Sequence, residues 1–165
     1  MIIAGIDPGQ SGAMAIMHSI DKVDFFDVPM MKLKGKQKPA WGQWAHDWAE
    51  ALANAKPALI VIEEVSARPG QGVTSMFNFG RSLGFAHALV AGLGRPVHFV
   101  TPQKWKAKMG LLNSNKAASI DKLVYLMPLC AANVRRAKDS GRAEAALLAY
   151  YGRRYLCSEI LAWDL

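Results

Sequence analysis

The feature that most constrains the fold is a short apolar run at the start of the chain that ends in a carboxylate. Residues 1–6 are apolar or glycine, and Asp7 follows them and leads directly into Pro8 and Gly9. A run of this length, closed by a Pro-Gly turn, predicts a buried β-strand. A buried carboxylate without a partner is costly. Asp7 is therefore either a simple turn former or a group whose charge is used.

A second apolar run repeats this pattern. Residues 58–62 are all apolar and end in Glu63 and Glu64, as expected for a strand that is buried on both faces. This run follows a helix that comes after a meander of strands, so a right-handed crossover would make it parallel to another strand of the sheet, and the first strand is its natural neighbour. Asp7 and one of the two glutamates would then emerge side by side at one edge of the sheet. Two carboxylates that lie so close together repel each other, so this arrangement favours a divalent metal between them.

Hydrophobic periodicity predicts the remaining elements. Strands are expected over residues 11–17, 22–28 and 96–100, the first two forming an antiparallel meander with the first strand. Helices are expected to begin at Pro39, at Thr74 and after Ser114. Thr74 and Ser114 would be the N-cap residues, and three tryptophans of the first helix would pack in the core. Gly80, Gly84 and Ala88 share one helix face, where small residues allow close packing on the sheet or on a partner helix.

Composition bounds the class of protein. The 165 residues favour one domain over 1–165. A net charge of +7 favours a polyanionic partner, nucleic acid first, with solubility alone as the alternative. No apolar run reaches the roughly 18 residues of a membrane span, and no secretion signal opens the sequence, so we expect an intracellular, cytoplasmic protein that does not bind a membrane. Cys130 and Cys157 are expected to be buried, reduced thiols.

Lysines gather in two places. Alternating lysines over residues 32–38 are expected in a solvated loop, although phosphate contacts are an open alternative. A second cluster follows the strand at 96–100, and lysines there fit phosphate binding better than a random polar face. The candidates for contact with the DNA backbone are Arg68, Lys104, Lys106, Lys108 and Lys116.

Three segments resemble the acidic motifs of RuvC-type Holliday junction resolvases, particularly the phage and prophage branch. They are residues 5–9 (GIDPG), 61–65 (VIEEV) and 141–149 (GRAEAALLA), and residues 69–80 and 101–106 are similar to the same branch. The resemblance implies an RNase H-like α/β fold, with a mixed five-stranded sheet of three antiparallel and then two parallel strands, flanked by helices. It also implies a homodimer that cuts four-way DNA junctions at two symmetry-related phosphodiesters, with a role in recombination and repair.

The resemblance further implies the site residues. Asp7 and Glu63 would be the strand carboxylates and Glu144 the helix carboxylate, holding Mg²⁺, or Mn²⁺ in its place. The family's remaining acidic residue usually lies three or four positions before the helix carboxylate, whereas Asp139 lies five before it. Residues five apart on a helix diverge. Either Asp139 serves from a non-helical segment, or Ser140 marks a weakening of the metal site.

Other functions remain open at this point. A catalytically weakened protein would bind junctions without cutting them. An RNase H-like nuclease could instead act on RNA or on other branched intermediates. A small actin-like ATP-binding protein would share the GIDPG opening, although such proteins are normally much longer.

Overall fold

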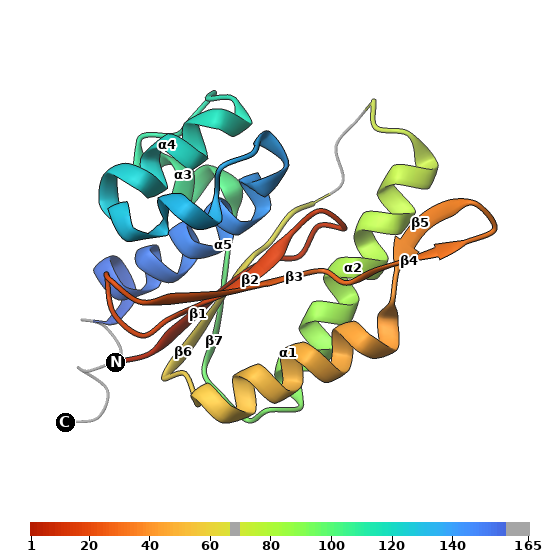
Figure 1. The fold of residues 1–165 in the computed structure, drawn as a ribbon, viewed down its shortest axis with the longest axis horizontal. Helices are drawn as coiled ribbons and strands as arrows, with labels where there is room; N and C mark the ends of the chain where they lie inside the picture. Colours follow the sequence, from red (N-terminus) through yellow and green to blue (C-terminus); the bar gives the residue numbers. More distant parts are fainter. Residues whose placement is uncertain (67–69, 158–165) are drawn as a thin grey trace.

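The computed structural model describes residues 1–66 and 70–157, and its centre is a mixed five-stranded sheet (Figure 1). The strands are β1 (Ile3–Asp7), β2 (Ala13–Met17), β3 (Val23–Asp27), β6 (Leu59–Glu63) and β7 (Val97–Val100). Their order in space is β3-β2-β1-β6-β7. The pairs β1–β2 and β2–β3 are antiparallel, and β1–β6 and β6–β7 are parallel. The predicted sheet of three antiparallel and two parallel strands is confirmed.

Helices cover both faces of this sheet, with α1 and α2 on one face and α3, α4 and α5 on the other (Figure 1). Their bounds are α1 (Trp41–Ala55), α2 (Val73–Ala91), α3 (Pro102–Met109), α4 (Lys116–Leu126) and α5 (Ser140–Tyr151). Two 3₁₀ segments, η1 (Pro128–Asn133) and η2 (Ala137–Asp139), precede α5, and a π-helical turn, η3 (Gly152–Leu156), follows it. The sheet is therefore sandwiched between two apolar cores.

Side chains of β1 alternate between these two cores. Ile3 packs in the core under α5, while Ala4 and Ile6 pack in the core under α1 and α2. Trp44 and Trp48 are fully buried in the second core, and Trp41 is partly buried and packs against it. The interpretation of the tryptophans as core residues is confirmed for Trp44 and Trp48, because the apolar stripe of α1 lies against the sheet as its spacing predicted.

The prediction of a solvated loop over residues 32–38 is wrong. The chain there forms an antiparallel hairpin of β4 (Met30–Leu33) and β5 (Lys36–Pro39), which is not part of the main sheet. Lys34 and Gly35 both have positive φ, 48° and 77°, as a tight two-residue hairpin turn requires. The alternation of lysines, taken as a sign of a polar loop, is also the period of a β-strand.

Three predicted helix starts are also wrong. Pro39 pairs with Met30 in the hairpin, so α1 begins two residues later. The residue before α2 is the extended Gly72, and Thr74 already lies inside the helix. Asn115, not Ser114, caps α4, because its side-chain oxygen accepts a 3.0 Å hydrogen bond from the backbone N–H of Ala118.

Two compositional expectations can be examined in the described residues. Cys130 and Cys157 are buried and unpaired, which confirms that both are free thiols. Across residues 1–66 and 70–157, no helix combines the length and the apolar character that a membrane crossing needs.

Candidate active site

The backbone of β1 lies directly against α5, and this contact positions the site. A Cβ atom on Gly5 would collide with the carbonyl oxygen of Ala145 and with the backbone nitrogen of Ala149. Only glycine permits so close an approach of strand and helix. The contact holds the first turns of α5 at the carboxyl end of β1. Glu144 is thereby brought to the end of the strand that carries Asp7, as the sequence predicted.

Asp7 ends β1 in a setting that disfavours its charge. Its Oδ1 accepts a 3.1 Å hydrogen bond from the backbone N–H of Gly9, which favours the charged form. Burial, followed by the negative charges of Glu63 and then Glu144, outweighs that bond and raises the pKa of Asp7 from 3.8 to about 7. Three carboxylates from three elements therefore act on one another at one edge of the sheet.

Glu63 ends β6, beside β1, and is 6% exposed. The indole Nε1 of Trp105 donates a 2.9 Å hydrogen bond to its Oε1. Trp105 is fully buried at the centre of α3, so this hydrogen bond fixes the orientation of the Glu63 carboxylate. Glu64 is exposed, and its backbone N–H continues the ladder to Val100. Of the two paired glutamates, Glu63 is the one that meets Asp7.

Glu144 is held by the two helices that pack beside α5. Its Oε1 receives a 2.9 Å bond from the Lys106 ammonium group on α3 and a 3.1 Å bond from the Ser119 hydroxyl on α4. Lys106 also lowers the pKa of Asp7, although by less than the carboxylates raise it. A cavity of about 360 Å³ opens over Asp7 and Glu144, with the exposed Lys116 on its wall.

These side chains fit a hard divalent cation. Carboxylate oxygens are the preferred ligands of Mg²⁺ and Mn²⁺, and a cation would relieve the repulsion that raises the pKa of Asp7. As the side chains stand, no three His, Cys, Asp or Glu residues of the described chain are grouped closely enough to hold one ion. Lys106 occupies one oxygen of Glu144, and Trp105 occupies one oxygen of Glu63.

Asp139, the fourth predicted ligand, is engaged elsewhere. The Arg136 guanidinium donates to both of its carboxylate oxygens, with the shortest contact at 2.7 Å, and the backbone N–H of Arg136 adds a 3.0 Å bond. The hydrogen bonds from Arg136 are the main reason that the pKa of Asp139 lies below its ordinary value. The charges acting on Asp7 are those of Glu63, Glu144 and Lys106. Asp139 can reach a metal beside Asp7 only if the contact with Arg136 opens.

A carboxylate at position 141, three residues before Glu144, is excluded by packing. A Cβ atom on Gly141 would collide with the carbonyl oxygen of Ser11 and lie 2.9 Å from the Cα of Gly12. The turn between β1 and β2 therefore occupies the space that a side chain at position 141 would need. This packing explains why position 141, one of the two positions where the family usually has an acidic residue, carries a glycine in this chain.

The predicted DNA-binding residues fall into different environments. Lys104 and Lys108 are exposed on α3, and Lys116 is exposed at the mouth of the carboxylate cavity. Lys106 is partly buried and forms an ion pair with Glu144. Arg68 lies outside the described residues.

Two residues of the site were not predicted. Neither Trp105 nor Ser119 was singled out from the sequence. Both lie on the buried face of their helix, four residues before a buried apolar residue, Met109 and Leu123 respectively. That spacing was a signal of burial, but it does not indicate contact with a carboxylate.

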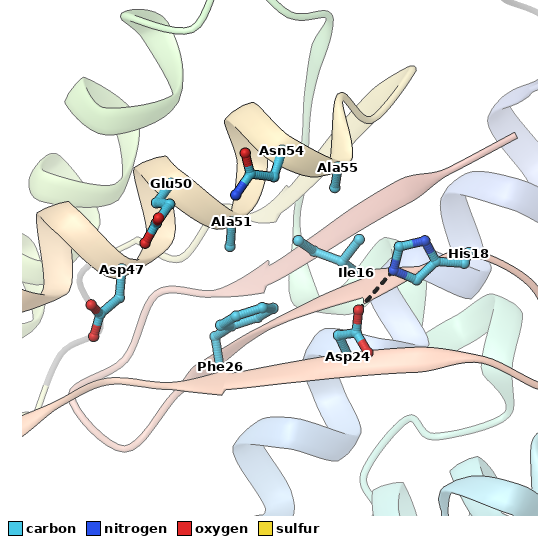
Figure 2. A pocket seen from close by; sticks show the side chains of 9 residues that line it. All are labelled: Ile16, His18, Asp24, Phe26, Asp47, Glu50, Ala51, Asn54 and Ala55. Atoms are coloured by element: carbon cyan, nitrogen blue, oxygen red, sulfur yellow. Dashed lines mark hydrogen bonds and ion pairs between the residues drawn. The ribbon is translucent and has the colours of Figure 1, made fainter.

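A larger groove, of about 610 Å³, lies away from these carboxylates, between α1 and the strands β2 and β3 (Figure 2). Its floor includes Ile16 and Phe26, and Asp47 and Glu50 lie along its α1 side. His18 Nε2 and Asp24 Oδ2 are 2.8 Å apart there and satisfy each other. The groove contains none of the predicted site residues.

Comparisons with known proteins identify the fold. Neither a protein-family model nor a curated protein matches the sequence. Among solved structures, T. thermophilus RuvC in complex with a Holliday junction substrate has a TM-score of 0.63 at 18% identity, over 94% of this chain and 97% of that chain. A further Thermus thermophilus RuvC structure has a TM-score of 0.57 at 18% identity, over 93% and 96% of the two chains.

A structure of Fowlpox virus resolvase with its substrate Holliday junction DNA has a TM-score of 0.50 at 15% identity, over 95% of this chain and 99% of that chain. At these identities the likeness concerns the fold. The chain therefore has the RNase H-like fold of RuvC, as its motifs predicted.

Proposed function

We propose that this protein is a metal-dependent endonuclease that resolves Holliday junctions and related branched DNA by paired phosphodiester hydrolysis. The observation that carries the proposal is the meeting of Asp7, Glu63 and Glu144 at one sheet edge, from three separate elements, under a cavity with Lys116 on its wall. The net charge of +7 suits a DNA partner.

The likeness in fold supports the same proposal. Two of the similar structures contain Holliday junction DNA, one with RuvC and one with a poxvirus resolvase. The motifs at residues 5–9 and 61–65 supply the carboxylates at the carboxyl ends of β1 and β6, and the motif at residues 141–149 supplies the carboxylate near the start of α5. Their resemblance to the phage and prophage branch of the RuvC-type family leads us to assign this chain to that branch.

The chemistry follows from the donor set. Asp7, Glu63 and Glu144 would hold Mg²⁺ or Mn²⁺, which when bound activates water and stabilises the departing oxygen. Trp105 keeps Glu63 oriented by its 2.9 Å hydrogen bond. Lys106 forms an ion pair with Glu144 and would be freed if that carboxylate turned to a bound cation. Lys116 is placed to contact the phosphate that enters the cavity.

Two cuts across a symmetric junction require two copies of a chain with one carboxylate cluster. We propose a homodimer formed through the exposed face of α2. Val73 is 86% exposed and Phe77 64% exposed, and Gly80, Gly84 and Ala88 continue the same open face. A Cβ atom on Gly80 or Gly84 would meet nothing within 4 Å, so this face has room for a partner helix.

One observation favours a second candidate function, a junction-binding protein with a weakened nuclease site. Asp139 is held by Arg136, and Gly141 has no space for a side chain. Such a protein would have only three carboxylates for metal. It would bind junctions tightly at low salt but release no product.

The proposal is tested with a labelled four-way junction and a linear duplex of matched sequence, each incubated with Mg²⁺, Mn²⁺ or EDTA. An Asp7→Asn variant runs in parallel, because asparagine keeps the shape and can still accept the bond from Gly9. We expect paired nicks in the junction that are absent with EDTA and with Asp7→Asn, and an uncut duplex.

Other outcomes separate the alternatives. Junction binding without cleavage in either metal would support the second candidate function. Equal cutting of junction and duplex, or preferential cutting of an RNA–DNA hybrid added as a third substrate, would contradict the proposed substrate.

A further inference from the structure

We infer that the β4–β5 hairpin and the neighbouring surface of α1 and α2 form a second DNA contact, which binds the phosphodiester backbone of the arm that leaves the carboxylate cavity. This inference rests on the proposed function and extends it. The hairpin is a separate two-stranded ribbon that projects beside α2 and beyond the main sheet (Figure 1).

The hairpin carries charge that the rest of the described chain does not neutralise. Its lysines are all exposed, and in the described part of the chain none lies within ion-pair distance of a carboxylate. They are Lys32, Lys34, Lys36 and Lys38. Isolated two-stranded ribbons are marginally stable in water. Four unpaired lysines on such a ribbon match a polyanion rather than a structural role.

The hairpin is continuous with the carboxylate cavity. Gln10 and Asn78 line that cavity and also line a second one, of about 280 Å³, which Lys36 and Lys38 line as well. A strand seated over Asp7 and Glu144 can therefore pass over two neutral polar side chains and reach the lysines. Hydrogen bonds and charges of this kind fix the register of DNA without reading its sequence.

An arginine completes this surface on the side of α2. Arg81 lines the second cavity, and its guanidinium lies 4.9 Å from the ring centre of Trp41 and 5.7 Å from that of Phe77. Arg81 is exposed and forms no ion pair within the described residues.

The ring of Trp41 also stacks on Trp44 at a centroid distance of 5.4 Å. Because Arg81 and Trp44 already cover much of the Trp41 ring, the guanidinium is the group that meets DNA, and it meets phosphate rather than a stacked base.

The test compares two double variants that lose the same charge. Lys36→Ala with Lys38→Ala removes the hairpin lysines of the second cavity, and Lys22→Ala with Lys122→Ala removes two lysines that do not line it. Junction affinity is measured in EDTA over a series of salt concentrations. We expect the hairpin variant to lose about tenfold in affinity and to reduce the salt slope by about 2, and the control to change by about twofold or less.

A second measurement reports which part of the DNA lies beside the hairpin. A photo-crosslinker attached at Lys36→Cys should join the protein to the DNA arm next to the incised bond, and one attached at Lys22→Cys should not. Both native cysteines are buried, so labelling is directed to the new one.

If the two double variants have equal affinities and equal salt slopes while the wild-type protein binds and cuts junctions, the hairpin contact is contradicted but the proposed function is not. A wild-type protein that binds no junction would overturn the proposed function, and the hairpin inference with it. Thermal unfolding of each variant shows that the substitutions leave the fold intact.

Discussion

At the scale of single residues, Asp7 carries its carboxylate charge in an unfavourable environment. Burial and two neighbouring carboxylates raise its pKa from 3.8 to about 7. The folded protein therefore binds a proton at Asp7 over a range of pH in which the unfolded chain does not. Stability that depends on this proton is present at low pH and is lost as the pH rises through that range.

We predict that Asp7→Asn stabilises the metal-free protein at about pH 8 and has no such effect at about pH 4. At about 1.4 kcal/mol per pKa unit, the shift sets an upper bound of about 4 kcal/mol on the gain. Urea unfolding in EDTA at both pH values measures it. Added Mg²⁺ should stabilise the wild type at the higher pH and have little effect on the variant. Parallel pH profiles for the two proteins would contradict the assignment.

Asp139 has the opposite behaviour, because Arg136 stabilises its charged form and lowers its pKa. Its contribution to stability is present above the ordinary carboxyl pKa and is lost as the pH falls below it. Arg136→Ala leaves a carboxylate that is 5% exposed with one backbone donor. We predict a loss of about 1–3 kcal/mol at neutral pH, which shrinks in acid, measured by urea unfolding.

Substitution of Asp139 itself tests whether this carboxylate takes part in cleavage. If its role is structural, Asp139→Asn lowers stability and changes the cleavage rate of the folded protein only a few-fold. Complete loss of cleavage by a variant of unchanged stability would instead make Asp139 a metal ligand.

At the scale of elements, the site depends on the contact between β1 and α5. Gly5→Ala places a methyl group against the backbone of Ala145, where neither side can yield easily. We predict a loss of about 3 kcal/mol or more and a larger loss of cleavage, since Glu144 moves with the helix. Unfolding and junction-cutting assays measure the two effects.

Gly42→Ala is the matched control, because a Cβ atom on this exposed helical glycine meets nothing within 4 Å. It should stabilise the protein by up to about 1 kcal/mol. Equal effects of the two substitutions would show that close packing at Gly5 is not needed.

At the scale of the whole molecule, paired cutting requires that two chains act together. Gly84→Arg places a long charged side chain at the centre of the exposed face of α2, where a Cβ atom meets nothing within 4 Å among the described residues. We predict that the wild type sediments as a dimer, and that the variant is a folded monomer that makes single rather than paired cuts. A variant that remains a dimer would place the interface elsewhere.

The sheet and its two strand carboxylates could be predicted because Asp7 and Glu63 each follow an unbroken apolar run. Glu144 was assigned through the resemblance of residues 141–149 to the third acidic motif of the RuvC-type family. The parallel pairing of β1 with β6 then follows from the handedness of crossovers.

The partners of these carboxylates could not be predicted in the same way. Trp105 lies 42 residues from Glu63 along the chain, and Lys106 lies 38 residues from Glu144. Such contacts depend on how α3 packs beside α5, which no local pattern encodes. The hairpin was missed because alternating lysines fit both a polar loop and an exposed strand, and the register that pairs Leu33 with Lys36 is set by the turn.

The most direct measurement uses a supercoiled plasmid that extrudes a cruciform, incubated with the wild-type protein and Mg²⁺. Two cuts made within the life of one complex convert the plasmid to linear molecules, whereas a single cut relaxes it and removes the cruciform. The proposed function predicts linear product from the start of the reaction and none from a plasmid without the cruciform. Accumulation of nicked circles alone, or no cutting of either plasmid, would contradict it.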